Sequence, residues 1–547
     1  MARDSAPVNA RLFQFFFRSF FISDVLAPGG DPRTLGITAA AFFAAPGIAI
    51  CLYMTIFGSR LNTNPEAAFF LALSMTLAPL LALVFWDELL PTRLDYLVLR
   101  PLPLSWPGIA AAKLLAWIVL LGLFLLVVNA FSCVMLPLVN SSDQVAGAAV
   151  LRRIAAQALG VGGGAVWAFL WVLALRGTLA FFGEARRVAM ALRLALTAAL
   201  LAAIVVSPEL TEPSIYRHLA AHPPPWALPL FWFLGVTHAL TGRAAATWNP
   251  LAFAAGRQLT YAAVAAALAY GAACWRLPRQ ALAPLAPPLR GPWPSAWASR
   301  QPRRAAVYRF ALATLARSRR HSLLLAAWLG LAAAAVLSSL ASLSWAFPAP
   351  TIEQADAVAL AAPLALCFLI AIGIRHTIAI PTEARAHWLF QLAETEPAPE
   401  RLLAFRDVLL ALAVLPALAS GVLLALRIWG GRIAALHLLF SGTLMLLLAE
   451  ALVCRVRKLP FTCPYVPGRA NLKFWWPAYW LAFSAFSFGA AALERSWWAH
   501  PLRIVGFSIL ALAATAALRG WNRHWRASLD ACQFDDAPDP AVQQLFQ

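Results

Sequence analysis

The sequence has few charged residues, few acids and few cysteines, and each shortage excludes a class of protein. Of 547 residues, 12% are charged and 61% are hydrophobic, and the mean hydropathy is +0.72. Soluble globular domains carry about 25% charged residues, so this chain belongs in a membrane. The high apolar content excludes intrinsic disorder. Seven cysteines in a chain of this length are too sparse for a disulfide scaffold.

Acidic residues are scarce relative to basic ones. The 43 Lys and Arg residues exceed the 24 Asp and Glu residues, which gives a formal net charge of +19. A basic chain can bind nucleic acid, but polytopic membrane proteins concentrate Lys and Arg in cytoplasmic loops that face anionic lipid. We therefore expect membrane lipid, and not nucleic acid, as the partner of these cations.

Twelve apolar runs predict membrane helices, since a span needs roughly 20 apolar residues. They indicate an all-α, polytopic integral membrane protein with about 12 transmembrane helices. The first six runs cover 37–57, 67–85, 109–138, 154–175, 194–206 and 259–275, and the second six cover 323–347, 357–374, 408–426, 433–453, 476–493 and 502–518.

The distribution of Lys and Arg predicts the orientation of these helices. If the N-terminus lies inside, the inner segments hold 33 of the 43 Lys and Arg residues. Both termini are then cytoplasmic, and the expected location is the bacterial inner (plasma) membrane. The first long apolar run begins only after residue 36 and has no convincing cleavage site, so no cleavable signal peptide is expected.

The chain divides into five expected segments. Residues 1–36 form a cytoplasmic N-terminus, in which Arg11, Gln14 and Arg18 recur on one face of an interfacial amphipathic helix. Two six-span membrane halves, 37–275 and 323–518, flank a basic, Pro-rich cytoplasmic linker at 276–322. Residues 519–547 form a cytoplasmic tail. Because six is even, the two halves have the same orientation and would form a parallel repeat.

Short matches at equivalent positions support an internal repeat. After the second span of each half, the loop opens with Pro-Thr, at Pro91 and at Pro381. The next helix of each half begins with a cation, Lys113 or Arg406. We therefore expect the two halves to have arisen by duplication.

Ionisable residues inside the membrane would indicate an ion-coupled carrier. The acids nearest to a membrane interior are Glu450, Asp407 and Asp356, and each lies at the end of an apolar run. This position disfavours an ion-coupled carrier without excluding it.

The predicted outer loop 207–250 is the best candidate for an enzymatic or metal site. It contains Glu209, Glu212, His218 and His222. Two histidines four residues apart can bind a metal on a helix, but three prolines follow His222 immediately and end any helix there. We expect no metal site and no catalytic residues.

The most informative segments are two predicted inner loops, 86–104 and 380–396. Each mixes charges, an aromatic residue and leucines, as a short amphipathic helix does. Equivalent helices in both halves suit docking to a two-fold symmetric cytoplasmic partner. The alternative is that both are interfacial turns whose charges snorkel to the headgroups.

These loops, with the N-terminal amphipathic helix and the segment 458–467, resemble the ABC-2 type permease family in a fused form with two halves. The resemblance implies that this chain is the permease subunit of an ABC exporter. Its coupling helices would be seated in a separate ATPase subunit, a dimer that holds the ATP and Mg. Many relatives carry one six-span half per chain, so the oligomeric state stays open.

One observation is independent of the resemblance. A P-loop ATPase requires G-x-x-x-x-G-K-[ST], and none of the three lysines follows a glycine. Any motor must therefore be another polypeptide, and we expect no cofactor in this chain and no enzymatic activity of its own. The alternatives are an ATP-independent secondary carrier built from parallel repeats and, third, a membrane-embedded enzyme.

The residues expected to contact the ATPase come from both loops. They are Glu88, Arg93, Asp95, Tyr96, Glu383, Arg385, Trp388 and Glu394. Nothing in the sequence identifies the substrate, the residues that line its path or a gating role for the outer loop.

Overall fold

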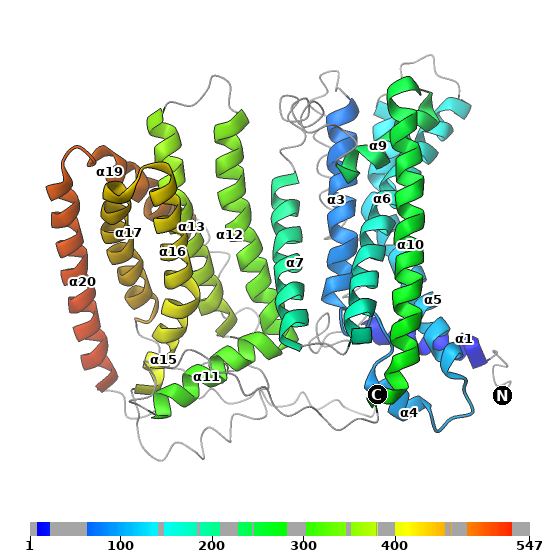
Figure 1. Ribbon diagram of the computed structural model, residues 1–547, viewed down its shortest axis with the longest axis horizontal. Helices are drawn as coiled ribbons and strands as arrows, with labels where there is room; N and C mark the ends of the chain where they lie inside the picture. The colour runs from blue at the N-terminus through cyan, green and yellow to red at the C-terminus, as the bar shows by residue number, and fades with distance from the viewer. Residues whose placement is uncertain are drawn as a thin grey trace, which may run out of the picture. The chain divides into compact units, whose positions relative to one another are not determined.

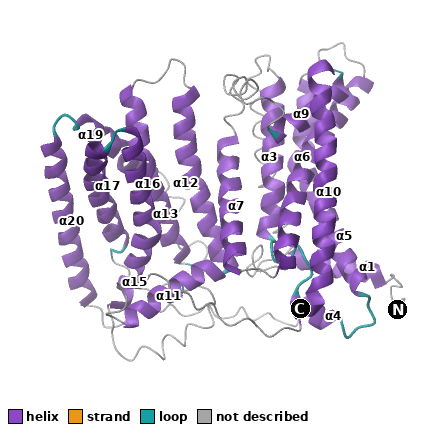
Figure 2. Cartoon of the chain, in the orientation of Figure 1, coloured by secondary structure: helices purple, strands orange, loops and turns teal. Residues whose placement is uncertain are grey.

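The computed structural model is helical throughout the residues that it describes (Figure 2). Those residues are 8–21, 63–139, 147–182, 186–207, 228–242, 245–281, 302–345, 352–378, 380, 400–454, 461 and 479–527.

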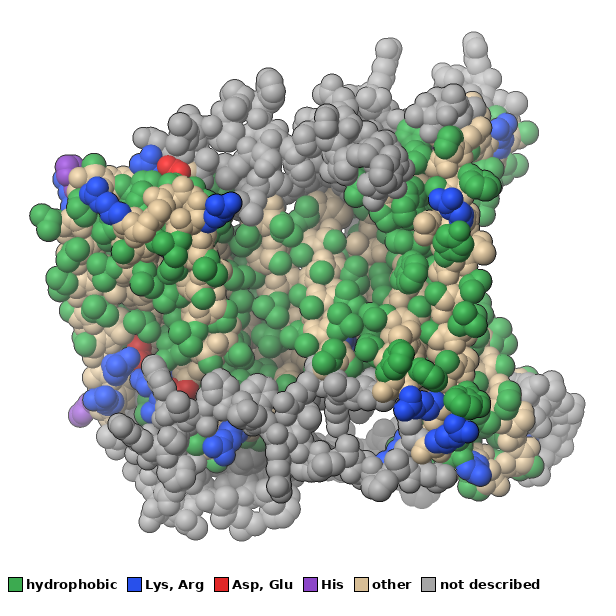
Figure 3. Space-filling model, viewed as in Figure 1, with side chains coloured by type: hydrophobic (Ala, Val, Ile, Leu, Met, Phe, Trp, Pro, Cys, Tyr) green, Lys and Arg blue, Asp and Glu red, His purple; other side chains and the backbone are tan. Residues whose placement is uncertain are grey.

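The chain forms two compact units, Met1–Ala286 and Pro287–Gln547. In the described residues of the two units, nine helices are long and apolar enough to cross a membrane. They indicate a multi-pass membrane protein. In each unit, the middle of the helices presents hydrophobic side chains on the visible face, and the charged side chains gather near the helix ends (Figure 3).

Unit 1 contains seven longer helices and one short one. They are α1 (Val8–Phe21), α3 (Thr63–Val84), α4 (Arg93–Leu99), α5 (Trp106–Val139), α6 (Gly147–Phe182), α7 (Arg186–Val206), α9 (Pro229–Thr241) and α10 (Ala245–Ala281). Helices α3, α5, α6, α7 and α10 stand upright in Figure 1, and α1 lies across their ends.

Unit 2 also consists of upright helices with one helix across their ends (Figure 1). Its elements are α11 (Pro302–Arg317), α12 (Arg319–Trp345), α13 (Ile352–Ile378), α15 (Glu400–Leu409), η4 (Leu410–Val414), α16 (Leu415–Ile428), α17 (Gly431–Leu452), η5 (Ala485–Gly489), α19 (Ala490–Ser496) and α20 (Pro501–Ala527). Helix α11 lies across the ends of upright helices, as α1 does (Figure 1).

Most of the predicted apolar runs lie in described helices. Run 408–426 lies in one span, Leu403–Ile428, that α15, η4 and α16 form together. Run 194–206 lies in α7, whose apolar part, Val188–Ile204, is shorter than a span. Run 476–493 overlaps a helical segment from residue 479 to 496 that η5 interrupts. Run 37–57 lies outside the described residues.

Helix α1 is amphipathic because an apolar side chain recurs at every fourth position. Leu12, Phe16 and Phe20 are buried, and the Phe20 ring lies 4.6 Å from the ring of Trp117 on α5. Arg11 is exposed. A helix with one apolar and one polar face, lying across the ends of the spans, has the arrangement expected for the interfacial helix.

Part of the expected linker is a helix. Segment 302–317 forms α11, and Tyr308, Leu312 and Leu315 bury one face of it against unit 2. Its composition, rich in arginine, suggested an irregular connection. The helical spacing of its apolar residues, every third or fourth position, determines the structure instead.

The helices of the two units make corresponding contacts. In unit 1, α6 packs against α3, α5 and α10, and in unit 2, α17 packs against α13, α16 and α20. Each unit also has one helix that lies across the ends of its spans, α1 in unit 1 and α11 in unit 2, called here the crosswise helix. It packs against the start of a span, α1 on α5 and α11 on α15. The order along the chain is the same in both units.

Candidate functional site

Helix α4 begins at the Pro-Thr pair of the first candidate loop. The hydroxyl of Thr92 accepts a hydrogen bond from the backbone N–H of Asp95 at 3.1 Å, and the Asp95 carboxylate accepts one from the backbone N–H of Thr92 at 2.8 Å. This capping box satisfies two N–H groups that the first helical turn leaves free. The sequence therefore fixes where α4 starts.

The Asp95 carboxylate also attaches α4 to the spans. It accepts a hydrogen bond from Lys113 Nζ of α5 at 2.7 Å, and Lys113 is 4% exposed. The Lys113 ammonium lies 5.2 Å from the ring centre of Phe16 on α1. Three helices therefore meet at this ion pair, and Asp95 fixes the position of α4 on them.

Tyr96 faces the same way as Asp95. It is 4% exposed, and its ring meets the Trp106 ring edge to face at 5.2 Å. Trp106 Nε1 in turn donates to the backbone oxygen of Cys274 on α10 at 2.9 Å. Tyr96 is therefore an anchor of α4 on the spans, and not an open contact residue.

The opposite face of α4 is apolar and exposed. Leu94, Leu97 and Val98 are 73%, 50% and 60% exposed, and their spacing of three and four residues places them side by side. Arg93 is exposed beside them, and Glu88, just before α4, is partly exposed. Contiguous apolar surface of this kind marks a site of interaction with protein or membrane. These three residues are not among the predicted contact residues, which are all charged or aromatic, although the leucines of this loop indicate an amphipathic helix.

The candidates of the second loop, Glu383, Arg385, Trp388 and Glu394, lie outside the described residues. The first residue of this loop, Ile380, is held by a hydrogen bond to α12. Its backbone oxygen lies 2.8 Å from His321 Nε2 of α12. His321 Nδ1 lies 2.6 Å from the hydroxyl of Ser318.

A cluster of charges in unit 2 surrounds Glu450 near the end of α17. Arg406 and Arg519 approach one carboxylate oxygen of Glu450 at 3.2 and 2.9 Å. Beside them Arg304 of α11 pairs with Asp407 of α15 at 2.6 Å. Burial raises the pKa of Tyr308 on α11, and the negative charge of Asp407 raises it further. These arginines neutralise both carboxylates and join four helices.

The other end of unit 2 buries a second ionisable pair. His437 of α17 is 1% exposed and Glu494 of α19 is 0% exposed. His437 Nδ1 lies 3.1 Å from both oxygens of the Glu494 carboxylate. Hydropathy does not predict this pair, because Glu494 follows the apolar run 476–493 by one residue. The signal was present, since His437 interrupts the run 433–453.

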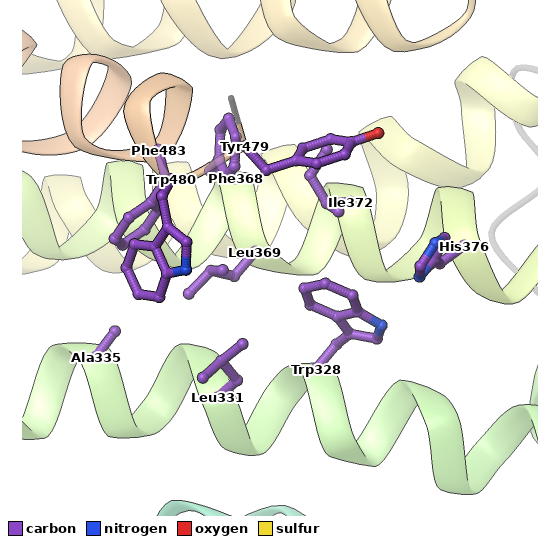
Figure 4. Close-up of a pocket in the computed structure, with 10 residues that line it drawn as sticks. All are labelled: Trp328, Leu331, Ala335, Phe368, Leu369, Ile372, His376, Tyr479, Trp480 and Phe483. Atoms are coloured by element: carbon purple, nitrogen blue, oxygen red, sulfur yellow. The ribbon is translucent and has the colours of Figure 1, made fainter. Parts of the chain in front are cut away.

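A groove in unit 2 lies between α12, α13 and the helical segment that begins at residue 479. Together with the open space at its mouth, it has a volume of about 610 Å³. Figure 4 shows aromatic rings along its walls, with His376 at one end of the row. Its lining residues are Trp328, Leu331, Ala335, Phe368, Leu369, Ile372, His376, Tyr479, Trp480 and Phe483. Such walls can accommodate an apolar chain or a flat ring, and the polar groups of the lining residues are those of His376, Tyr479 and the indole N–H groups of Trp328 and Trp480.

No catalytic constellation or metal ligand set emerges from the parts of the chain that the structure describes. Within those parts, no three His, Cys, Asp or Glu residues are grouped to bind a metal ion. Glu209, Glu212, His218 and His222 of the predicted outer loop lie outside them. No family model matches this chain, and neither a curated protein nor a solved structure matches it.

Proposed function

We propose that this chain is the permease subunit of an ATP-driven exporter of the ABC-2 type. In this proposal, it translocates substrate across the bacterial inner membrane, and a separate dimeric P-loop ATPase in the cytoplasm drives it. Helix α4 acts as a coupling helix that transmits movement of the ATPase to the spans. Twelve spans form two parallel halves, and both termini are cytoplasmic.

The observation that carries the proposal is the two-sided structure of α4. Asp95 and Tyr96 attach one side to α5, where Lys113 and Trp106 lie, and Leu94, Leu97 and Val98 are exposed on the other. A rigidly attached helix with a free apolar face can seat in a groove of another protein and transmit a displacement directly to the spans.

The corresponding helix contacts of the two units support the parallel halves. Each unit has a crosswise helix that packs against the start of a span, and each has a central helix that contacts the same neighbours in the same order. A duplicated permease gives a two-fold symmetric ATPase two equivalent docking positions.

Replacing the exposed apolar face of α4 tests the proposal. Leu94→Asp combined with Val98→Asp places two charges in the contact and leaves the Asp95–Lys113 pair intact. Because buried apolar residues dominate such interfaces, we expect the co-purified ATPase to fall by about tenfold or more. The measurement is affinity purification of the tagged chain from gently solubilised native membranes, with an assay of ATP hydrolysis.

Leu151→Asp is the matched control, because Leu151 is 68% exposed but lies at the predicted outer end of α6. We expect this variant to retain the ATPase. Equal recovery of a P-loop ATPase with the double variant, or none with the unaltered chain, would contradict the proposal.

An ATP-independent carrier is the second candidate function. The buried pair of His437 and Glu494 favours it, because ionisable residues within a membrane span are typical of proton pathways. Transport that continues after ATP depletion and follows an ion gradient would establish the carrier, and transport that stops would exclude it.

A further inference from the structure

The walls of the groove in unit 2 are aromatic rings that are held in place by packing. Phe368 and Phe483 are buried, and their ring centres lie 5.7 Å apart. The Trp328 ring of α12 lies against Gly373 of α13, where a methyl group would come within 2.9 Å of Trp328 Cδ1. Trp328 also meets the ring of His376 edge to face at 5.8 Å. The shape of the groove is therefore set by packed rings and by one required glycine.

Three polar groups of the lining lie toward one end of the groove. Figure 4 shows the Trp328 indole nitrogen and the Tyr479 hydroxyl on the sides of their rings that face His376, with Leu331 and Ala335 toward the opposite end. Within the described part of the chain, no hydrogen bond engages the indole of Trp328, the hydroxyl of Tyr479 or the ring of His376. The groove therefore offers hydrogen-bonding groups at the His376 end and apolar walls at the other.

The groove lies at the depth of the hydrocarbon layer. Its residues on α12 belong to the candidate span Arg320–Leu337, and those on α13 belong to the candidate span Asp356–Ile378. From Phe368 to His376 the helix rises about 12 Å, which is long enough for much of one acyl chain. The apolar material that surrounds a span at this depth is the acyl chains of lipid.

Two arginines continue the groove beyond its polar end. Arg320 precedes Leu331 by eleven residues, about three helical turns, so both lie on the same face of α12. Arg375 follows Phe368 by seven residues, about two turns, on α13, and it is exposed. The start of α12 lies beside the end of α13, because His321 contacts the backbone oxygen of Ile380. Both cations therefore lie toward the same end as His376.

Negative charge does not offset these cations along the groove. None of the described residues that line it is an Asp or a Glu. The buried carboxylates near the ends of α15 and α17 are engaged elsewhere, Asp407 by Arg304 and Glu450 by Arg406 and Arg519. This end of the groove therefore complements an anionic group, as basic pockets between membrane helices do for lipid headgroups.

We propose that this groove is a binding site for an anionic phospholipid. One acyl chain lies along the aromatic walls, and the ester and phosphate oxygens accept hydrogen bonds from Trp328, Tyr479 and His376. These oxygens are acceptors, which suits the indole N–H and the other donors at this end. The positive charge of Arg320 and Arg375 favours a lipid with net negative charge over a zwitterionic one. In the predicted orientation, the lipid belongs to the cytoplasmic leaflet, which is rich in anionic lipid.

Photocrosslinking of the full-length protein in lipid nanodiscs locates the bound chain. The discs consist of phosphatidylcholine with a trace of phosphatidylglycerol that carries a diazirine in one acyl chain, and mass spectrometry identifies the labelled peptides. We expect the label to concentrate in the segments 328–335 and 479–483. It should decrease as unlabelled phosphatidylglycerol replaces the phosphatidylcholine of the disc.

Two variants test the apolar end and the polar end separately. Ala335→Trp fills the apolar end, so label in the groove should fall by about tenfold. Leu337→Trp is the matched control on the same helix, because Leu337 is 51% exposed and lies outside the lining. In the unaltered protein, the phosphatidylglycerol probe should label the groove several times more than a phosphatidylcholine probe with the same diazirine chain. His376→Glu places a negative charge at the polar end, and we expect it to abolish this preference.

An even distribution of label over the exposed faces of the spans would overturn the proposal. Equal label in the grooves of Ala335→Trp and Leu337→Trp, or equal labelling of the unaltered protein by the two probes, would also contradict it. If Ala335→Trp does not fold, the comparison of the two probes on the unaltered protein and on His376→Glu decides the question. The measurements need no ATPase, so their outcome is independent of the proposed export function.

Discussion

At the scale of single residues, the buried carboxylates differ in the group that neutralises them. Glu450 lies between two arginines, which are charged at every physiological pH. Asp95 pairs with Lys113 and closes a helix cap. Glu494 faces a histidine, His437, whose Nδ1 lies 3.1 Å from its carboxylate. The same kind of acidic group is therefore paired with arginine, with lysine and with histidine at three different places in the fold.

Glu450→Gln removes the charge that two buried arginines share. Because an uncompensated charge remains, we expect the free energy of unfolding to fall by about 3 kcal/mol. Chemical denaturation in mild detergent measures it. Asp87→Asn is the control, because Asp87 also pairs with an arginine, Arg193, but its side chain is 59% exposed. The control is expected to cost less than about 1 kcal/mol, and equal losses for the two variants would contradict the argument.

At the scale of elements, close packing between helices depends on glycine at particular positions. A methyl group on Gly177 of α6 would lie 2.7 Å from the backbone of Ala269 on α10. Backbone atoms cannot rotate away as a flexible side chain can. Small residues of this kind let membrane helices approach closely, so α6 and α10 are held together by a contact that any side chain disturbs.

Gly177→Ala should therefore force α6 and α10 apart. We expect a loss of about 1–3 kcal/mol in the free energy of unfolding, typical of overpacking. Gly122→Ala is the matched control, since no atom lies within 4 Å of a methyl group there. The control should keep the unfolding midpoint of the unaltered protein. A Gly177 variant as stable as the control would show that the two helices can separate without cost.

Hydropathy alone could predict most of the long helices, because a span is defined by the length of an apolar run. It could not predict α11, since four arginines lower the hydropathy of this helix although Tyr308 and Leu312 are buried. In α4, the sequence located the helix but not its inward face. Asp95 and Tyr96 are anchored by Lys113 and Trp106, which lie in α5 after an intervening turn. Tertiary contacts of this kind leave no local pattern in the sequence.

At the scale of the whole molecule, charge and helix packing point to a chain that repeats one plan. Each unit has a crosswise helix near one end of its upright helices, and the predicted inner segments hold 33 of the 43 Lys and Arg residues. By the positive-inside rule, this count predicts the same membrane orientation for both units. The candidate coupling helix α4 would then face the compartment that contains ATP.

Single cysteines in a chain otherwise free of cysteine test this orientation for each unit separately. A membrane-impermeant thiol reagent added to intact cells should label Leu151→Cys in unit 1 and Arg432→Cys in unit 2, which are exposed at the predicted outer ends. Leu102→Cys and Arg523→Cys are exposed near the opposite ends and should react only after permeabilisation. Reversed labelling in unit 1 would place α4 outside the cell and end the coupling proposal. Reversal in unit 2 alone would show that the halves are antiparallel.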